Sequence, residues 1–136
     1  MKLIQTYRES DNLVDWLQRL VGAVADVENF RDIGGTNNPA FQNNWANILD
    51  TGVAVNAVAF YKDPYGRVHI KGSADTGANG TTVFTLPEGY RPLETLTLVT
   101  TKLTGVIGVI TIDTDGTVDS TVGNANGVSL NVSFRT

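Results

Sequence analysis

Alternating apolar and polar residues, interrupted by tight turns, run through most of this chain and restrict it to a β-rich fold. Residues 58–62 and 67–71 flank Asp-Pro-Tyr-Gly at residues 63–66, which has proline at the second position and glycine at the last, as in a type I turn. Within the second segment Val68 and Ile70 alternate with polar side chains, so one face should be buried and the other hydrated. We therefore predict an antiparallel hairpin.

The same pattern continues to the end of the chain. Asp115-Gly116 separates two alternating segments, which is a strong hairpin signal. Residues 86–92 are predicted to bend, because they contain prolines that a central strand excludes. Residues 75–80 have no apolar anchor and are predicted to form a mobile loop. Strands are predicted over residues 53–62, 67–74, 81–86, 96–102, 106–113, 117–122 and 128–134. This number and spacing of strands predict an antiparallel β-sandwich or jelly roll.

The N-terminal segment has the pattern of an α-helix. Ser10 is a suitable N-cap, and Asp11 favours the positive end of a helix. After it, leucine and valine recur at alternating steps of four and three residues, which is the spacing of a helix–helix contact. The residues of this seam are Leu13, Leu17, Leu20, Val24 and Val27.

This apolar seam must be buried, because a short helix alone is marginal in water. It can pack on the chain's own sheet or on the same helix of sister chains. We favour the sister chains, because the spacing is nearer the 3.5-residue period of a helix–helix seam, and because Gly34-Gly35 and the following Asn-Asn-Pro indicate a spacer. The chain then divides into a helical oligomerisation stem, residues 1–36, and a β-sandwich domain, residues 37–136.

Composition excludes several classes of function. The 136 residues suffice for a single core, and the net charge of −4 argues against general affinity for nucleic acid or anionic membranes. The absence of cysteine excludes disulfides and thiolate chemistry. No apolar run is long enough to insert into a membrane, and the first residues are too polar for a secretory signal. We expect a protein that is made and kept soluble.

Motifs of catalysis and metal binding are not found in the sequence. His69 is the single histidine, without an orienting group or further ligands that the sequence identifies, so we expect a solvent-facing or interface residue. Residues 113–119 contain three aspartates but lack the closing glutamate of a calcium loop, and their Asp-Gly is explained by a hairpin turn. No nucleophile elbow, phosphate loop or dinucleotide fingerprint occurs. We predict no enzyme activity, metal or cofactor.

Candidate ligand contacts are Tyr65, Arg67, His69 and Tyr90, which lie in or near predicted turns. Aromatic residues near turns could stack on sugar rings, although they more often pack into the core. Tyr65, at a turn apex, is the one we expect to be exposed, whereas Tyr90 is expected to pack at a corner. Because of these residues, a carbohydrate-binding module is the alternative function. A cell-wall hydrolase is disfavoured, because the sequence shows no recognisable pair of catalytic carboxylates.

Three strings of residues resemble a module of bacteriophage tail, baseplate and head-fibre proteins. They are Asn-Pro-Ala-Phe-Gln-Asn-Asn-Trp at residues 38–45, Val-Ala-Phe-Tyr-Lys-Asp-Pro-Tyr-Gly-Arg-Val-His-Ile-Lys-Gly at 58–72 and Thr-Thr-Val-Phe-Thr-Leu-Pro-Glu-Gly-Tyr-Arg-Pro at 81–92. Asp-Gly-Thr-Val at 115–118 and the final strand are also similar, so the resemblance covers residues 38–134.

The resemblance implies a β-sandwich, homotrimeric, on a virion appendage of a phage of Gram-positive hosts. A helix before a sandwich is similar to the shoulder region of receptor-binding proteins of lactococcal-type siphophages, where three helices pack on the threefold axis. Those proteins continue into a neck and a saccharide-binding head, whereas this chain ends with its sandwich. We expect a module that anchors or decorates the virion beside other tail proteins. The resemblance assigns no saccharide-binding residues to this chain.

Overall fold

The computed structural model of the chain describes residues 14, 17, 29–101, 105, 107–122 and 127–136. It is mainly β, and every strand pair is antiparallel. The strands are β1 (Arg31–Asp32), β2 (Ala46–Asn47), β3 (Leu49–Asp50), β4 (Val53–Ala54), β5 (Ala59–Lys62), β6 (Arg67–Lys71), β7 (Ser73–Asp75), β8 (Thr81–Thr85), β9 (Leu96–Thr101), β10 (Ile107–Ile112), β11 (Thr117–Val122), β12 (Val128–Ser129) and β13 (Val132–Arg135). The prediction of an antiparallel, mainly β fold is confirmed.

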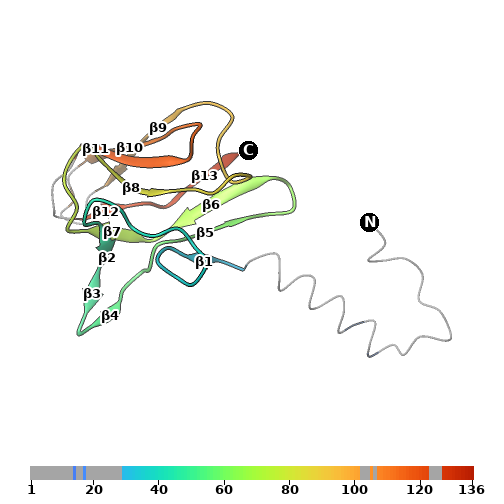
Figure 1. The fold of residues 1–136 in the computed structure, drawn as a ribbon, viewed down its shortest axis with the longest axis horizontal. Helices are drawn as coiled ribbons and strands as arrows, with labels where there is room; N and C mark the ends of the chain where they lie inside the picture. Colours follow the sequence, from blue (N-terminus) through green and yellow to red (C-terminus); the bar gives the residue numbers. More distant parts are fainter. Residues whose placement is uncertain (1–13, 15–16, 18–28, 102–104, 106, 123–126) are drawn as a thin grey trace.

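The strands form two four-stranded sheets, ordered β1-β5-β6-β13 and β8-β11-β10-β9, and two smaller ones (Figure 1). A three-stranded sheet has the order β12-β7-β2, and β3 pairs with β4 alone. Both predicted hairpins are present: β5 pairs with β6 and β10 pairs with β11. The Asp-Gly turn of the second closes with a hydrogen bond from the Asp113 N–H to the Thr117 carbonyl of 3.0 Å.

One hydrophobic core is shared by the two four-stranded sheets. Phe60, Val68 and Ile70 belong to the first sheet, and Phe84 and Ile110 belong to the second, and all are at most 3% exposed. In β6 and β10 buried side chains alternate with more exposed ones, whereas Ala59 and Phe60 in β5, and Val83 and Phe84 in β8, are buried in succession. The alternation that predicted β6 therefore also predicted its buried side chains, Val68 and Ile70.

Three segments predicted as continuous strands are divided in the structure. Residues 67–74 break at Gly72, whose φ of 112° is unfavourable for other residues. Residues 128–134 break beside it, where the Leu130 N–H donates to the Gly72 carbonyl at 2.9 Å. Residues 53–62 break near Asn56, which has a positive φ. The breaks lie where the chain passes from one sheet to another, so register with partner strands outweighs the local pattern.

The loop of residues 75–80 has an anchor that the sequence did not reveal. Trp45 is 3% exposed, and Gly77 lies directly against its indole ring. The indole N–H donates to the Thr81 hydroxyl at 2.9 Å, and the Thr76 hydroxyl donates to the Asn44 carbonyl at 2.7 Å. The prediction that this loop lacks an apolar anchor is wrong, because the anchor comes from a distant part of the chain.

The expected helical stem lies almost entirely outside the described residues. Of the seam, Leu13, Leu20, Val24 and Val27 are not described, and Leu17 is 43% exposed. Within the range assigned to the stem, strand β1 pairs with β5 and Ile33 is buried in the shared core. In the described part of the chain, no helix has the length and apolar character needed to cross a membrane.

Candidate functional site

The turn between β5 and β6 positions most of the candidate ligand contacts. Its Gly66 N–H donates to the Asp63 carbonyl at 3.1 Å, and the Asp63 N–H donates to the Arg67 carbonyl at 2.8 Å. Proline fixes the backbone at residue 64, and Gly66 takes a positive φ of 84°. Tyr65 therefore projects from the turn, 85% exposed, as predicted.

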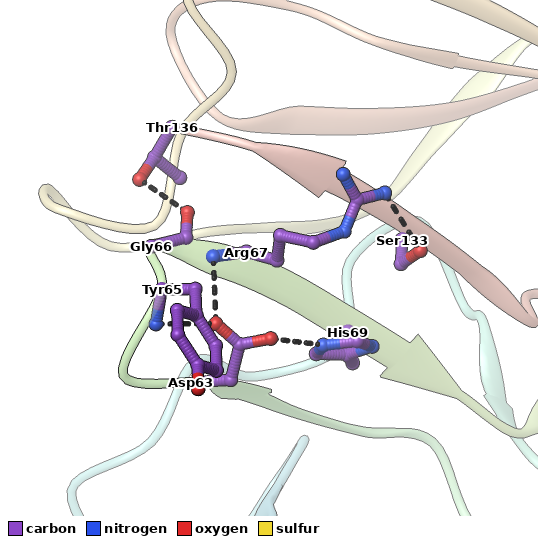
Figure 2. A network of polar contacts seen from close by, with 7 residues as sticks. All are labelled: Asp63, Tyr65, Gly66, Arg67, His69, Ser133 and Thr136. Atoms are coloured by element: carbon purple, nitrogen blue, oxygen red, sulfur yellow. Dashed lines mark hydrogen bonds and ion pairs between the residues drawn. The ribbon is translucent and has the colours of Figure 1, made fainter.

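The carboxylate of Asp63 ties this turn to the sheet (Figure 2). Its Oδ1 accepts the N–H groups of Tyr65 at 2.9 Å and Arg67 at 3.0 Å. Its Oδ2 lies 2.8 Å from Nε2 of His69. We call Asp63, these two N–H groups and the His69 ring the Asp63 clasp. The His69 hydrogen bond, and then the backbone N–H groups, hold the pKa of Asp63 below its usual value of 3.8.

His69 has aromatic as well as polar neighbours. Its ring stacks on Tyr61, with centroids 4.8 Å apart and an interplanar angle of 14°. Phe30 contacts Tyr61 edge-on at 4.5 Å, and Nζ of Lys71 lies 4.9 Å from the Phe30 centroid. The side chain of His69 is 32% exposed. The sequence identified no partner for His69, which was expected to be a solvent-facing or interface residue; in the structure it is partly exposed and has Asp63 and Tyr61 as partners.

The four candidate ligand contacts divide into two places. Tyr65, Arg67 and His69 belong to one end of the β5–β6 hairpin, and Arg67 donates to the Ser133 hydroxyl at 3.2 Å (Figure 2). Tyr90 packs on Phe60, with ring centroids 5.2 Å apart, and adjoins the hydrophobic core. Because Phe60 and Tyr61 point to opposite faces of β5, Tyr90 does not join the other candidates.

The arrangement resembles part of a catalytic triad but lacks its hydrogen bonding. Ser133 faces His69 across the β6–β13 pair. Its hydroxyl, however, accepts the Arg67 hydrogen bond, and Nε2 of His69 is directed to Asp63. A nucleophile needs a hydrogen bond to its base. The geometry instead explains a mechanical role, in which Asp63 fixes the turn and His69 fixes Asp63.

The sequence contained a usable signal for this clasp. Asp63 is the first residue of a turn, where aspartate commonly accepts hydrogen bonds from the N–H groups that follow. His69 lies six residues later, on the strand that returns beside it. Pairing Tyr61 with His69 in the predicted hairpin would also have placed the two rings opposite each other, as they are. The three-dimensional pairing of Trp45 with Gly77 had no comparable local signal.

The aspartates of the β10–β11 hairpin are engaged by threonines. Asp115 accepts both the N–H and the hydroxyl of Thr117, and these bonds hold the pKa of Asp115 below its usual value. Asp113 accepts the Thr95 hydroxyl at 2.9 Å. Among the described residues, no group of three or more histidine, aspartate or glutamate side chains is placed to hold a metal ion. These hydrogen bonds explain the aspartates as parts of turns.

The Asp63→Asn variant should have a lower free energy of unfolding at neutral pH, and its stability should change less as the pH falls. The lowered pKa means that the clasp stabilises the fold above the ordinary aspartate pKa and loses this contribution as pH falls through the lower, folded value. Urea midpoints at pH 6 and pH 3 would measure both effects. Asp50→Asn removes the same charge from an exposed site outside the clasp, and an equal flattening there would contradict the assignment.

The comparisons with known proteins assign no family to this chain. No family model, curated protein or solved structure matches it. Its function is therefore inferred from its residues and their geometry.

Proposed function

We propose that this chain is a non-enzymatic structural or adhesion component of a bacteriophage tail or baseplate, made in the host cytoplasm and assembled into the virion. In this proposal it is a homotrimer joined by the helix expected in residues 1–36. The observation that carries the proposal is the role of the resembling strings in the fold. Residues 58–72 supply the β5–β6 hairpin, and residues 81–92 supply β8 and the bend after it. Both contribute buried side chains to the shared core.

We further infer that the β part is a sandwich of the two four-stranded sheets. Phe60 and Ile70 from one sheet and Phe84 and Ile112 from the other belong to a single buried cluster, which is how the inner faces of a sandwich pack. The three-stranded sheet β12-β7-β2 extends this core, because β6 and β7 are consecutive and β12 and β13 follow the same path. Such a body suits display on a virion.

The Asp63 clasp supports the non-enzymatic part of the proposal. Both carboxylate oxygens of Asp63 have hydrogen-bond partners from its own hairpin. The Tyr61 ring is covered on one face by His69 and approached by the edge of Phe30. These groups rigidify the hairpin, and the Ser133 hydroxyl opposite His69 is engaged by Arg67.

The Leu17→Asp variant should dissociate the proposed trimer. A carboxylate on the seam would be buried without a partner, which costs several kcal/mol for each ion. Multi-angle light scattering should give three times the 14.6 kDa chain mass for the unchanged protein and a single chain mass for the variant. Far-UV circular dichroism of the β part should be retained, because the described core contains no seam residue.

Gln18→Asp is the matched control for this experiment. It adds the same charge one residue away, outside the predicted seam, and should leave the mass at that of a trimer. A monomeric unchanged protein at high concentration would reject the trimer. If the Leu17→Asp variant falls to the monomer mass and also loses the far-UV circular dichroism of the β part, the helix packs on its own sheet instead.

The alternative function, a module that binds a host cell-wall polysaccharide, is favoured by one observation. Tyr65 is 85% exposed at the tip of the hairpin, two residues before the cationic Arg67. An exposed ring beside polar groups is the usual element of a sugar-binding surface. Binding of the protein to purified cell walls, and its loss in Tyr65→Ala but not Tyr90→Phe, would support this alternative; equal binding by Tyr65→Ala would reject it.

A further inference from the structure

A two-stranded ribbon, β3 with β4, projects from the body of the protein (Figure 1). Its turn is formed by Thr51 and Gly52, with φ of 50° and 82°, and matches the hairpin turns whose twist suits paired strands. Every residue from position 49 to position 56 is exposed. We call residues 48–55 the arm. A hairpin without a third strand or a packed face is marginally stable in water.

The arm carries apolar side chains on both of its faces. Leu49, 62% exposed, pairs with Ala54 on one face. Val53 and Val55, 67% and 48% exposed, lie on the other face, since side chains alternate along a strand. Asp50 pairs with Val53 and is the charged side chain on this second face. Apolar groups on both faces indicate a segment that is contacted by another surface.

A second apolar surface lies on the outer face of β9 and β10. Val99 is 75% exposed and Ile107 is 65% exposed, whereas their neighbours Leu98 and Ile110 face the core. Neither strand contains a charged residue. The opposite edge of this sheet is covered, because the Gln42 N–H donates to the Val83 carbonyl at 2.8 Å. The β9 side therefore lacks the charges that usually protect an exposed strand.

The arm and β9 lie on different sides of the protein, far apart in the view of Figure 1. The arm of one chain therefore cannot cover its own β9. Two complementary surfaces placed apart on one subunit are what a head-to-tail contact requires, and such contacts generate a closed ring when the rotation closes. Both surfaces are apolar, and the arm contributes a single charged residue, Asp50.

We propose that the arm of one subunit packs against the outer face of β9 and β10 of the next copy of this chain. Leu49 and Ala54, which share one face of the arm, would then contact Val99 and Ile107, and each subunit would both give and receive an arm. This contact rests on the proposed trimer and adds to it an interface within the β part. It assigns a role to apolar side chains that neither the shared core nor the Asp63 clasp uses.

The size of the arm decides in favour of a second copy over an unrelated partner. A stable complex buries about 800 Å² on each partner, from roughly 20 to 30 residues. The arm is far smaller, so it cannot hold a free partner by itself. Copies already joined by a stem meet at a high effective concentration, so a small contact then forms at a lower cost of association. The contact is therefore an internal one of the assembly.

The chain contains no cysteine, so engineered disulfides can test this contact directly. In the Leu49→Cys/Val99→Cys variant, mild oxidation should give disulfide-linked dimers and trimers, and mass spectrometry should identify a peptide joining positions 49 and 99. The control is Leu49→Cys/Tyr65→Cys, because Tyr65 is at least as exposed as Val99 but lies outside the proposed contact. The expected yield of the 49–99 link is at least tenfold that of the 49–65 link.

Two outcomes would overturn the inference. A 49–99 yield no higher than that of the control would show that the surfaces do not meet, and a predominant 49–49 link would show that arms contact each other instead. Light scattering of the unchanged protein separates the two proposals. A trimer without the 49–99 link rejects the arm contact alone, whereas a monomer rejects the trimer and, with it, the contact that depends on the stem.

Discussion

Replacing Gly72 with alanine is expected to destabilise the protein by about 3 to 5 kcal/mol, from left-handed backbone strain and overpacking together. A Cβ at this position would lie 2.5 Å from Cα of Val58 and 2.6 Å from the Ala57 carbonyl oxygen. Both contacts are with backbone, which cannot rotate away. The φ of 112° at Gly72 adds strain for any residue with a side chain. Urea unfolding followed by far-UV circular dichroism would measure the loss.

The surroundings of Gly72 prevent the neighbouring segment from moving aside. Val58 is fully buried, and its N–H donates to the Asn47 side chain at 2.8 Å. The Gly72 N–H itself donates to the Asn131 side chain at 3.1 Å. Gly80→Ala is the control, since Gly80 has a φ of 71° but no atom within 4 Å of an added Cβ. It should cost only about 1 to 2 kcal/mol. Equal losses in the two variants would contradict the steric argument.

Gly72 also shows where sequence reasoning reached its limit. The alternation of Val68 and Ile70 correctly predicted a strand and its buried face. The same alternation gave no sign that the strand would end at Gly72 and continue in another sheet, because that break depends on the approach of residues 57 and 58. Patterns with a period of two residues report burial, whereas the passage between sheets is set by contacts between distant segments.

The candidate site was predictable to a similar extent. The Asp-Pro-Tyr-Gly turn of residues 63–66 gave the hairpin and the exposure of Tyr65. Tyr90 was expected to pack at a corner, but the sequence did not identify Phe60 as its partner, since this depends on which face of β5 the Tyr90 ring meets. His69 was read without its partner, although Asp63 is close in sequence. Local turn chemistry can be read from residue types, but the partner of a side chain follows from strand register.

The second large effect is expected at Trp45 and Gly77, which form a contact between distant segments. Gly77→Ala should cost about 3 kcal/mol or more, because the added Cβ would overlap the buried indole ring. Trp45→Leu should cost about 2 to 3 kcal/mol, because it removes part of a buried aromatic side chain and the indole hydrogen bond to Thr81. Each single variant would be compared with the unchanged protein by urea unfolding.

The double variant distinguishes a specific contact from two unrelated losses. If the indole ring is what excludes a side chain at position 77, then Gly77→Ala should cost much less in the Trp45→Leu background, since leucine leaves room for a methyl group. The free-energy losses would then fall short of additivity by about 2 kcal/mol, within the range measured for residues in contact. Additive losses would mean that the strain at Gly77 comes from its backbone. The loop of residues 75–80 would then be held by its own hydrogen bonds, and Trp45 would serve the core alone.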